Sequence, residues 1–167
     1  MTQPRLTREQ VLWGLLRLSI GWLCLWAFLD KTLGLGFPTQ PRWAWLNGGS
    51  PTFAFLKFGA KGILAPVAKW FLLNPFLDWL FMLSLLFVGG ALTLGVAVRI
   101  GGALGAGLFV MMYLVGFTPP DMNPFLSEHV IYALLCVGFV TTRAGHWIGL
   151  GRRWVETRWV KRYPILE

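Results

Sequence analysis

Residues 79–98 read WLFMLSLLFVGGALTLGVAV and contain no charged side chain. Crossing the hydrocarbon core of a bilayer takes roughly 20 mainly apolar residues in a helix, so this stretch predicts a transmembrane helix. Asn74 is a good N-cap and Pro75 suits the first helical position, so the helix is expected to start there, with its membrane span at 76–98. Arg99 follows directly and is expected to end the span at the membrane surface.

Three other stretches have the same length and apolar character. The four predicted spans are 11–29, 76–98, 100–117 and 127–148. The second and third follow each other so closely that they are expected to form a tight antiparallel hairpin. Gly101 and Gly105, four residues apart, are expected to let a neighbouring helix approach closely. We therefore predict an all-α membrane protein, in which residues 1–167 form one membrane domain built as a four-transmembrane-helix bundle.

The segment between the first two spans has a different character. Residues 30–75 are too apolar for a flexible linker, yet their longest apolar run, 62–73, is interrupted by Pro66 and Lys69. A run of this length does not cross a bilayer. We predict a partly helical cap that lies in the membrane interface.

The positions of the basic residues predict the orientation. The chain has 15 Lys and Arg against 7 Asp and Glu, a balance that in a soluble protein would suggest nucleic acid. Here the charges lie between and after the apolar runs, so we expect no nucleic-acid partner. Arg5, Arg8, Arg99, Arg143 and a basic tail at 149–167 share one side, which the positive-inside rule assigns to the cytoplasm. We expect a multi-pass protein of the cell (inner or cytoplasmic) membrane with both termini cytoplasmic and the 30–75 cap extracytoplasmic.

One face of the first span carries an unusual residue. Arg17, Gly21, Cys24, Phe28 and Lys31 recur at spacings of three and four, which places them on one side of a helix. A charged residue inside a span is by default a functional candidate. Arg17 lies near the start of its helix, however, so snorkelling to the headgroups or pairing within the bundle explains it as well.

A second group of polar residues lies at the predicted outer ends of the spans. Its members are Asp30, Lys31, Asp78, Glu128 and His129. Antiparallel helices would bring them to one level, where they could form a single polar site. His129 is the natural proton-transfer residue, and Tyr132 shares its helix face. A quinone head group needs such a place, although Asp78 and Glu128 could instead only complement the dipoles of their helices.

Haem and metal ions are not expected as cofactors. The second histidine, His146, lies 17 residues from His129 on the same predicted helix, which is roughly 25 Å away. Cys24 and Cys136 are isolated within apolar runs and form no ligand set at metal-binding spacing. We interpret both cysteines as small buried apolar residues.

Several motifs along the chain resemble a known family. They are RLSIGWLCLWAFLDK at 17–31, WLNGGSP at 45–51, DWLFM at 78–82, NP at 123–124 with HVIY at 129–132, and AGHWIGLGR at 144–152. Together they resemble the DoxX/DoxD-like membrane proteins, and the similarity covers nearly the whole chain. The resemblance implies a four-helix membrane protein similar to the DoxD subunit of a thiosulfate:quinone oxidoreductase, which works with a second subunit, DoxA.

If the resemblance extends to activity, it implies that thiosulfate binds on the outer side, near Lys31, Lys57 and Lys61 or at a helix N-terminus. It would give electrons to membrane quinone near His129 and Tyr132. The candidate catalytic residues are His129, Tyr132 and Asp30, and the candidate substrate-binding or quinone-binding residues are Arg17, Lys31, Asp78 and Glu128. Quinone would then act as the electron acceptor.

Two other functions fit the sequence. The chain could be a non-catalytic membrane anchor or accessory subunit of a larger redox or respiratory complex, with lipid and the other subunits as its partners. It could also be a small transporter with a path lined by Arg17 and the outer acids. The uncharged second and third spans offer little to line such a path, so the transporter ranks last.

Overall fold

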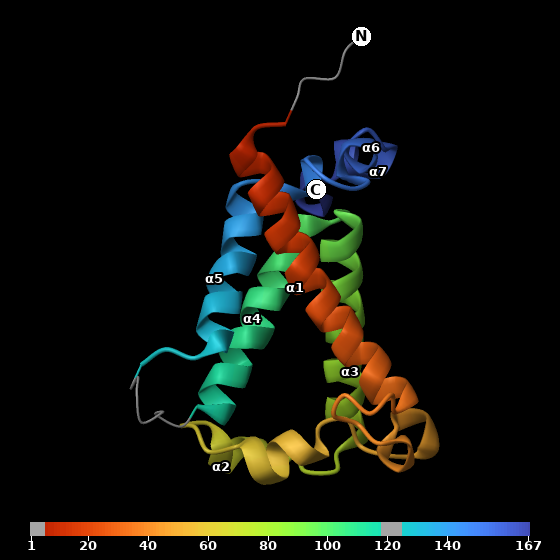
Figure 1. Cartoon of the computed structure of the whole chain (residues 1–167), viewed down its shortest axis with the longest axis vertical. Coiled ribbons are helices and arrows are strands. Elements are labelled where there is room, and N and C mark those ends of the chain that lie inside the picture. Colours follow the sequence, from red (N-terminus) through yellow and green to blue (C-terminus); the bar gives the residue numbers. More distant parts are fainter. Residues whose placement is uncertain (1–5, 118–124) are drawn as a thin grey trace.

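The chain folds as a bundle of helices (Figure 1). The computed structural model describes residues 6–117 and 125–167, and this part of the chain is all-helical. Its α-helices are α1 (Arg8–Leu33), α2 (Ala65–Lys69), α3 (Pro75–Leu94), α4 (Val98–Gly116), α5 (Glu128–Thr141), α6 (Gly151–Val155) and α7 (Arg158–Arg162). Three of them, α1, α3 and α4, are long and apolar enough to cross a membrane. The predicted helical class is confirmed, and the three helices indicate a membrane protein.

Helix α1 is longer than the predicted 11–29 span because both of its ends are capped. Thr7 and Gln10 form a capping box, in which each side chain accepts a hydrogen bond from the backbone N–H of the other. At the far end, Gly34 adopts a left-handed conformation with φ of 70° and donates its N–H to the Asp30 carbonyl. Glycine takes this conformation without steric cost, which is why the helix ends there.

Helix α3 begins as predicted and ends earlier. The Asn74 side chain accepts a hydrogen bond from the Phe76 N–H at 2.9 Å, and Pro75 occupies the first helical position. The helix stops at Leu94 because Gly95, with φ of 76°, caps it. Arg99 therefore lies in the first turn of α4 instead of closing α3.

Helix α5 is shorter than the predicted 127–148 span. Its 14 residues follow Ser127, the predicted N-cap, and end at Thr141. They extend over about 21 Å at 1.5 Å per residue, which is less than a typical hydrocarbon core. Arg143 then adopts a left-handed conformation, and Ala144–His146 form a 3₁₀ turn. Among the described residues, 6–117 and 125–167, the structure thus shows three helices of spanning length and one shorter apolar helix.

The helices pack in two pairs. Helix α1 packs along α3, α4 packs along α5, and contacts between α3 and α4 join the pairs. The core between them includes Cys24, Met82, Val88, Cys136 and Phe139, none of which is exposed. Toward one end of the bundle, α1 and α3 diverge from α4 and α5 (Figure 1).

Glycines on α4 bring its neighbours close, as the sequence predicts. A Cβ atom on Gly101 would lie 2.7 Å from the Ala91 Cβ of α3. A Cβ on Gly105 would lie 3.0 Å from the Val88 Cγ1 and 3.1 Å from the Cys136 Sγ. Both α3 and α5 therefore press directly on this helix.

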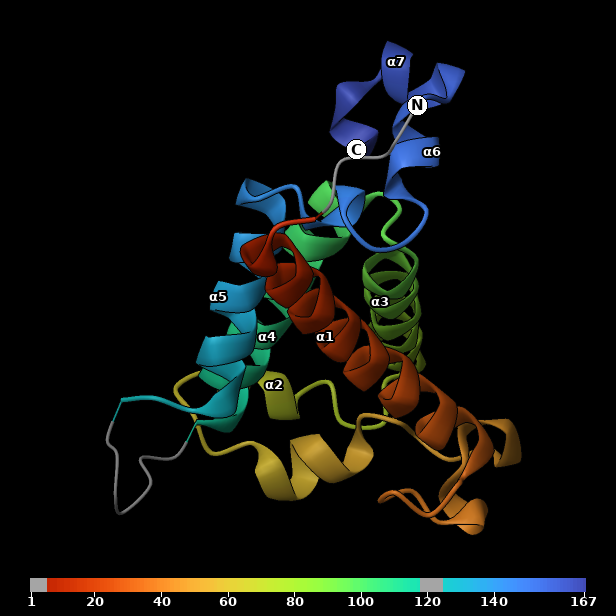
Figure 2. The ribbon, with the colours of Figure 1, turned by 45° about the horizontal axis from the view of Figure 1, so that its top comes forward.

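Residues 34–74, which we call the connection, cover the end where the helix pairs diverge (Figure 2). They contain 3₁₀ turns at Pro41–Trp43 and Trp45–Asn47, a π-helical turn at Phe55–Gly59, and α2. The Lys61 and Gly62 N–H groups donate to the Val115 carbonyl, and the Leu64 N–H donates to the Leu114 carbonyl. The predicted partly helical character is confirmed. We call this the connection end of the bundle, and the opposite end, covered by residues 142–167, the tail end.

Candidate functional site

A cavity of about 270 Å³ lies at the connection end, between the last turn of α4, the first turn of α5 and the π-helical turn of the connection. We call it the His129 cavity. Its lining residues are Phe55, Tyr113, Gly116, Phe117, Leu126, Ser127, Glu128 and His129. Aromatic and apolar walls with a few polar groups are typical of small-molecule sites.

Two aromatic rings hold His129 in place. The imidazole centroid lies 6.4 Å from the ring of Phe109 and 6.5 Å from that of Tyr132, and these two rings are themselves 5.3 Å apart. Its Nδ1 lies 3.7 Å from Oε1 of Glu128. The His129 side chain is 22% exposed and that of Glu128 is 65% exposed. The imidazole can therefore face the cavity on one side and a solvent-accessible carboxylate on the other.

Ser127 adds a hydrogen-bonding group to the cavity. Its Oγ is buried, and within residues 6–117 and 125–167 it has no hydrogen-bond partner. A buried hydroxyl without a partner is unfavourable, so a ligand oxygen that accepted its hydrogen bond would be stabilised. Beside it, the Tyr113 hydroxyl donates to the Phe125 carbonyl at 2.9 Å, which joins the end of α4 to the segment before α5.

Sequence reasoning missed most of this lining. It treated Ser127 only as a helix cap, and it did not select Tyr113 or Phe117. The position of Ser127 directly before Glu128 and His129 was the available signal. Phe55 lies far from α5 in the sequence, so nothing near it in the chain indicated that it lines this cavity.

Asp30 and Asp78 have a different role, because both carboxylates hold the connection. Asp30 is 1% exposed and accepts hydrogen bonds from the N–H groups of Phe37 at 2.8 Å and Thr39 at 2.9 Å. Asp78 is 6% exposed and accepts from the Ser50 hydroxyl at 2.9 Å and from Thr52 through its N–H at 3.1 Å and its hydroxyl at 2.6 Å. Both acids therefore fasten the connection to helix ends.

The candidate residues at the connection end thus fall into two groups. Glu128 and His129 line the cavity from the first turn of α5, and Tyr132 lies behind His129 with its ring centroid 6.5 Å from the imidazole. The end of α1, with Asp30 and the half-buried Lys31, lies on the other side of the bundle from the start of α5 (Figures 1 and 2). The acids on α1 and α3 share an end with His129 but do not line its cavity.

Arg17 lies toward the tail end and is fully buried. Its Nη1 donates to the Leu92 carbonyl, with the Thr93 carbonyl at 3.4 Å, and its Nη2 donates to the Ile148 carbonyl. Carbonyls in the last turn of a helix have no partner within that helix. Arg17 supplies a hydrogen-bond donor to such a carbonyl in α3 and, through its bond to Ile148, joins α3 to the segment after α5. This is pairing within the bundle, one of the two explanations that the sequence left open.

Metal ligands do not gather in the described ranges 6–117 and 125–167: no group of three His, Cys, Asp or Glu residues there could hold a metal ion. The two histidines lie at opposite ends of α5, His129 in its first turn and His146 beyond its last residue.

Comparison of the chain with known protein families, with curated proteins and with solved structures finds no match.

Proposed function

We propose that this chain is a membrane redox protein that binds the ring of a quinone in the His129 cavity. The observation that carries the proposal is an aromatic cavity whose edge bears the His129 imidazole and the Ser127 hydroxyl, which has no hydrogen-bond partner in the described part of the chain. A quinone is a flat apolar ring with two carbonyl oxygens, each of which needs a hydrogen-bond donor. Phe55 and Phe117 would pack against the ring, while Ser127 and His129 would bond the two oxygens.

The same arrangement offers a route for protons. Reduction of a quinone to a quinol takes two electrons and two protons. The exposed Glu128 carboxylate lies 3.7 Å from the His129 imidazole, a gap that one water molecule could bridge. A proton would then pass from solvent to Glu128, through that water to His129, and on to a quinone oxygen. Tyr132 packs against His129 without lining the cavity, so it acts by positioning the imidazole.

Topology and electron source form the second part of the proposal. Helix α5 would be the fourth span, with the connection as the extracytoplasmic cap and the basic tail in the cytoplasm, in agreement with the positive-inside rule. The resemblance to DoxD-like proteins suggests thiosulfate as the donor and a DoxA-like subunit as partner. Lys57, whose Nζ lies 5.0 Å from the Phe53 ring centroid, is an exposed cation on the connection that could attract the anion.

The test uses the full chain in lipid nanodiscs with a short-chain quinone analogue. Wild type is expected to bind the analogue and, alone or with its partner subunit, to reduce it with thiosulfate. His129→Ala should lower turnover by about a hundredfold through loss of proton transfer. Ser127→Ala should weaken binding by about tenfold through loss of one hydrogen bond.

Thr141→Ala is the matched control, because it removes an exposed hydroxyl at the other end of the same helix. It should leave both binding and turnover unchanged. Wild-type protein that neither binds the analogue nor reduces it, with or without a partner subunit, would overturn the proposal.

A non-catalytic accessory subunit is the second candidate. The observation in its favour is that Asp30 and Asp78, two of the residues expected to act on substrate, are occupied in holding the connection. Purification in mild detergent separates the two functions. A stable larger assembly whose quinone reduction survives His129→Ala would favour the accessory subunit.

A further inference from the structure

Residues 142–167 fold back onto the tail end of the bundle. After α6 and α7, a 3₁₀ turn at Pro164–Leu166 returns the chain to α4. The Arg99 N–H donates to the Glu167 carbonyl at 2.9 Å, and the Trp154 Nε1–H donates to the Leu166 carbonyl at 2.6 Å. These bonds hold Glu167 against the start of α4.

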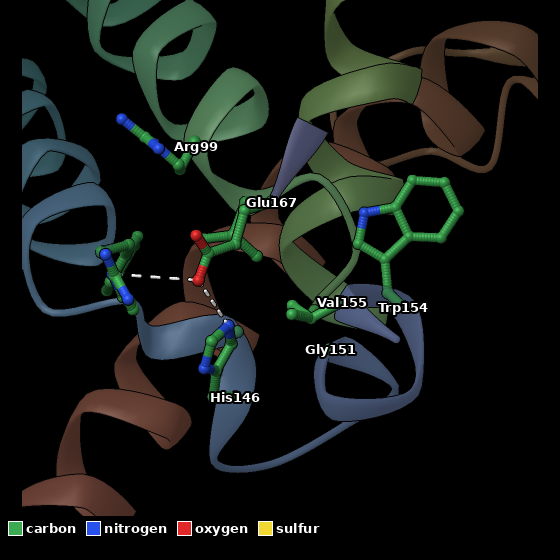
Figure 3. A pocket seen from close by; sticks show the side chains of 11 residues that line it. Arg99, His146, Gly151, Trp154, Val155 and Glu167 are labelled. Carbon is green, nitrogen blue, oxygen red and sulfur yellow. Dashed lines mark ion pairs between the residues drawn. The ribbon is translucent and has the colours of Figure 1, made fainter. Parts of the chain in front are cut away.

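The Glu167 side chain points into a recess at this place (Figure 3). Its Oε1 lies 2.8 Å from Nε2 of His146 and 3.8 Å from Nε of Arg143, and Arg99 also lines the recess. The carboxylate is 13% exposed, and only about 10 Å³ of space is left beside it. Because a water molecule needs at least that much room, the carboxylate itself fills the recess.

The tail that carries the recess is strongly basic, and Arg99 and Arg143 line the recess itself. The cationic side chains of residues 142–167 are Arg143, Arg152, Arg153, Arg158, Lys161 and Arg162, and the acidic ones are Glu156 and Glu167. A concave surface lined by one sign of charge concentrates ions of the opposite sign. The recess would therefore attract an oxyanion from outside the chain if Glu167 left it.

The Glu167 carboxylate does not form hydrogen bonds with the two cationic side chains beside it. The His146 Nε2 is buried and close to the carboxylate, but the contact is not aligned as a hydrogen bond. The Arg143 Nε, at 3.8 Å, is beyond hydrogen-bond distance, and its side chain is 65% exposed. A group with more acceptor oxygens than a carboxylate, such as a phosphate, could bond both cations at once.

The segment that carries Glu167 is also weakly packed. Among residues 152–167, Val160 is the buried side chain, and those of Tyr163 and Ile165 are 48% and 66% exposed. Segments that bury few apolar contacts open at low free-energy cost. The carboxylate can therefore leave the recess without disturbing the helix bundle.

We propose that the recess is a binding site for a phosphate group, that Glu167 is its built-in occupant, and that a bound phosphate displaces it and releases residues 163–167 from α4. The phosphate of an anionic lipid headgroup and free inorganic phosphate share this chemistry. The recess does not contain His129, so the site is independent of the proposed quinone site.

The first arm of the test measures binding of inorganic phosphate, by calorimetry, to the full chain in phosphatidylcholine nanodiscs. Glu167→Ala should bind phosphate about tenfold more tightly than wild type, because the internal competitor is gone. Glu156→Ala, an exposed acid in the same tail, is the matched control for the change in charge and should bind like wild type. Adding His146→Ala to Glu167→Ala should abolish the gain.

The second arm measures hydrogen exchange of residues 163–167 in wild type. If headgroups are the source, exchange should rise in phosphatidylglycerol nanodiscs, and if free phosphate is the source, it should rise on adding phosphate to phosphatidylcholine nanodiscs. Equal phosphate affinity of Glu167→Ala and Glu156→Ala, or unchanged exchange under both conditions, would refute the site. If Glu167→Ala does not fold, Glu167→Gln, which keeps the shape of the side chain, gives the same comparison.

Discussion

Arg17 shows how a single charged side chain can be accommodated inside an apolar bundle. A buried guanidinium usually requires an acid, but here its donors meet the carbonyls of Leu92 and Ile148. These groups come from the last turn of α3 and from the turn after α5. Because the guanidinium presents donors in a planar fork, it can bond both segments, whereas a lysine would offer a single ammonium group.

At this scale we predict that Arg17→Leu destabilises the protein by about 3 kcal/mol, since two buried carbonyls lose a charged donor. Arg17→Lys should recover only part of that loss. The free energy of unfolding of each variant would be measured in detergent, with circular dichroism monitoring the loss of helix. Arg8→Leu, at the exposed start of the same helix, is the control, and an equal effect of Arg8→Leu and Arg17→Leu would contradict the prediction.

Asp78 is the corresponding anchor at the connection end. Asp78→Ala removes the acceptor of the Ser50 and Thr52 hydrogen bonds, so residues 50–56 should exchange backbone hydrogens faster while the helices stay protected. Hydrogen exchange read by mass spectrometry measures this. Glu9→Ala removes an exposed acid from the first turn of α1 and should leave residues 50–56 unchanged. Similar exchange in both variants would argue against anchoring.

At the scale of single elements, the features that the sequence predicted correctly are those that depend on neighbouring residues in the chain. Asn74 and Pro75 predicted the start of α3 because a cap and its helix are neighbours in the chain. The spacing of Arg17, Gly21 and Cys24 predicted that they share one face of α1, and the structure shows all three buried. These features depend on contacts within one element, which periodicity and capping rules describe.

The remaining features depend on contacts between distant segments. The ends of α3 and α5 were missed because Gly95 and Arg143, both in left-handed conformations, lie within apolar runs that hydropathy treats as continuous. Asp78 and its partner Thr52 are 26 residues apart. The His129 cavity is lined by residues from three segments of the chain, so no single stretch of sequence could predict it.

Packing of α4 gives an element-scale prediction. A Cβ on Gly102 would lie 2.7 Å from the Val140 Cγ2 and 2.9 Å from the Cys136 carbonyl oxygen, whereas a Cβ on Gly107 meets nothing within 4 Å. Gly102→Ala should therefore destabilise the protein by about 1–3 kcal/mol through overpacking. Gly107→Ala should be neutral or stabilising by up to about 1 kcal/mol, because alanine favours helix. Detergent unfolding of both variants tests the difference, and equal stabilities would show that α5 can shift without cost.

At the scale of the whole molecule, the outer surface of the bundle is apolar. Leu12, Leu83 and Met111, on three different helices, are 57%, 53% and 53% exposed. Such a surface is suited to lipid rather than water. The connection and the basic tail cover opposite ends of this surface (Figure 2).

The proposed topology makes a prediction at this scale. Cys24 and Cys136 are fully buried, so the natural chain should not react with a membrane-impermeant maleimide. In intact cells, Gln40→Cys on the connection should be labelled and Arg158→Cys on the tail should not. Both should be labelled after permeabilisation. Labelling of both in intact cells would place the connection and the tail on the same side of the membrane.

The bonds from the connection to the carbonyls of Leu114 and Val115 have a mechanical consequence. Irregular backbone can lie beside hydrocarbon only when its polar groups are paired, and this part of the connection takes its acceptors from the end of α4. If the chain is pulled from the bilayer by an atomic force microscope tip, residues 61–64 and α4 should therefore yield together, as one force peak. Separate peaks would mean that the connection rests on lipid and not on the helix beneath it.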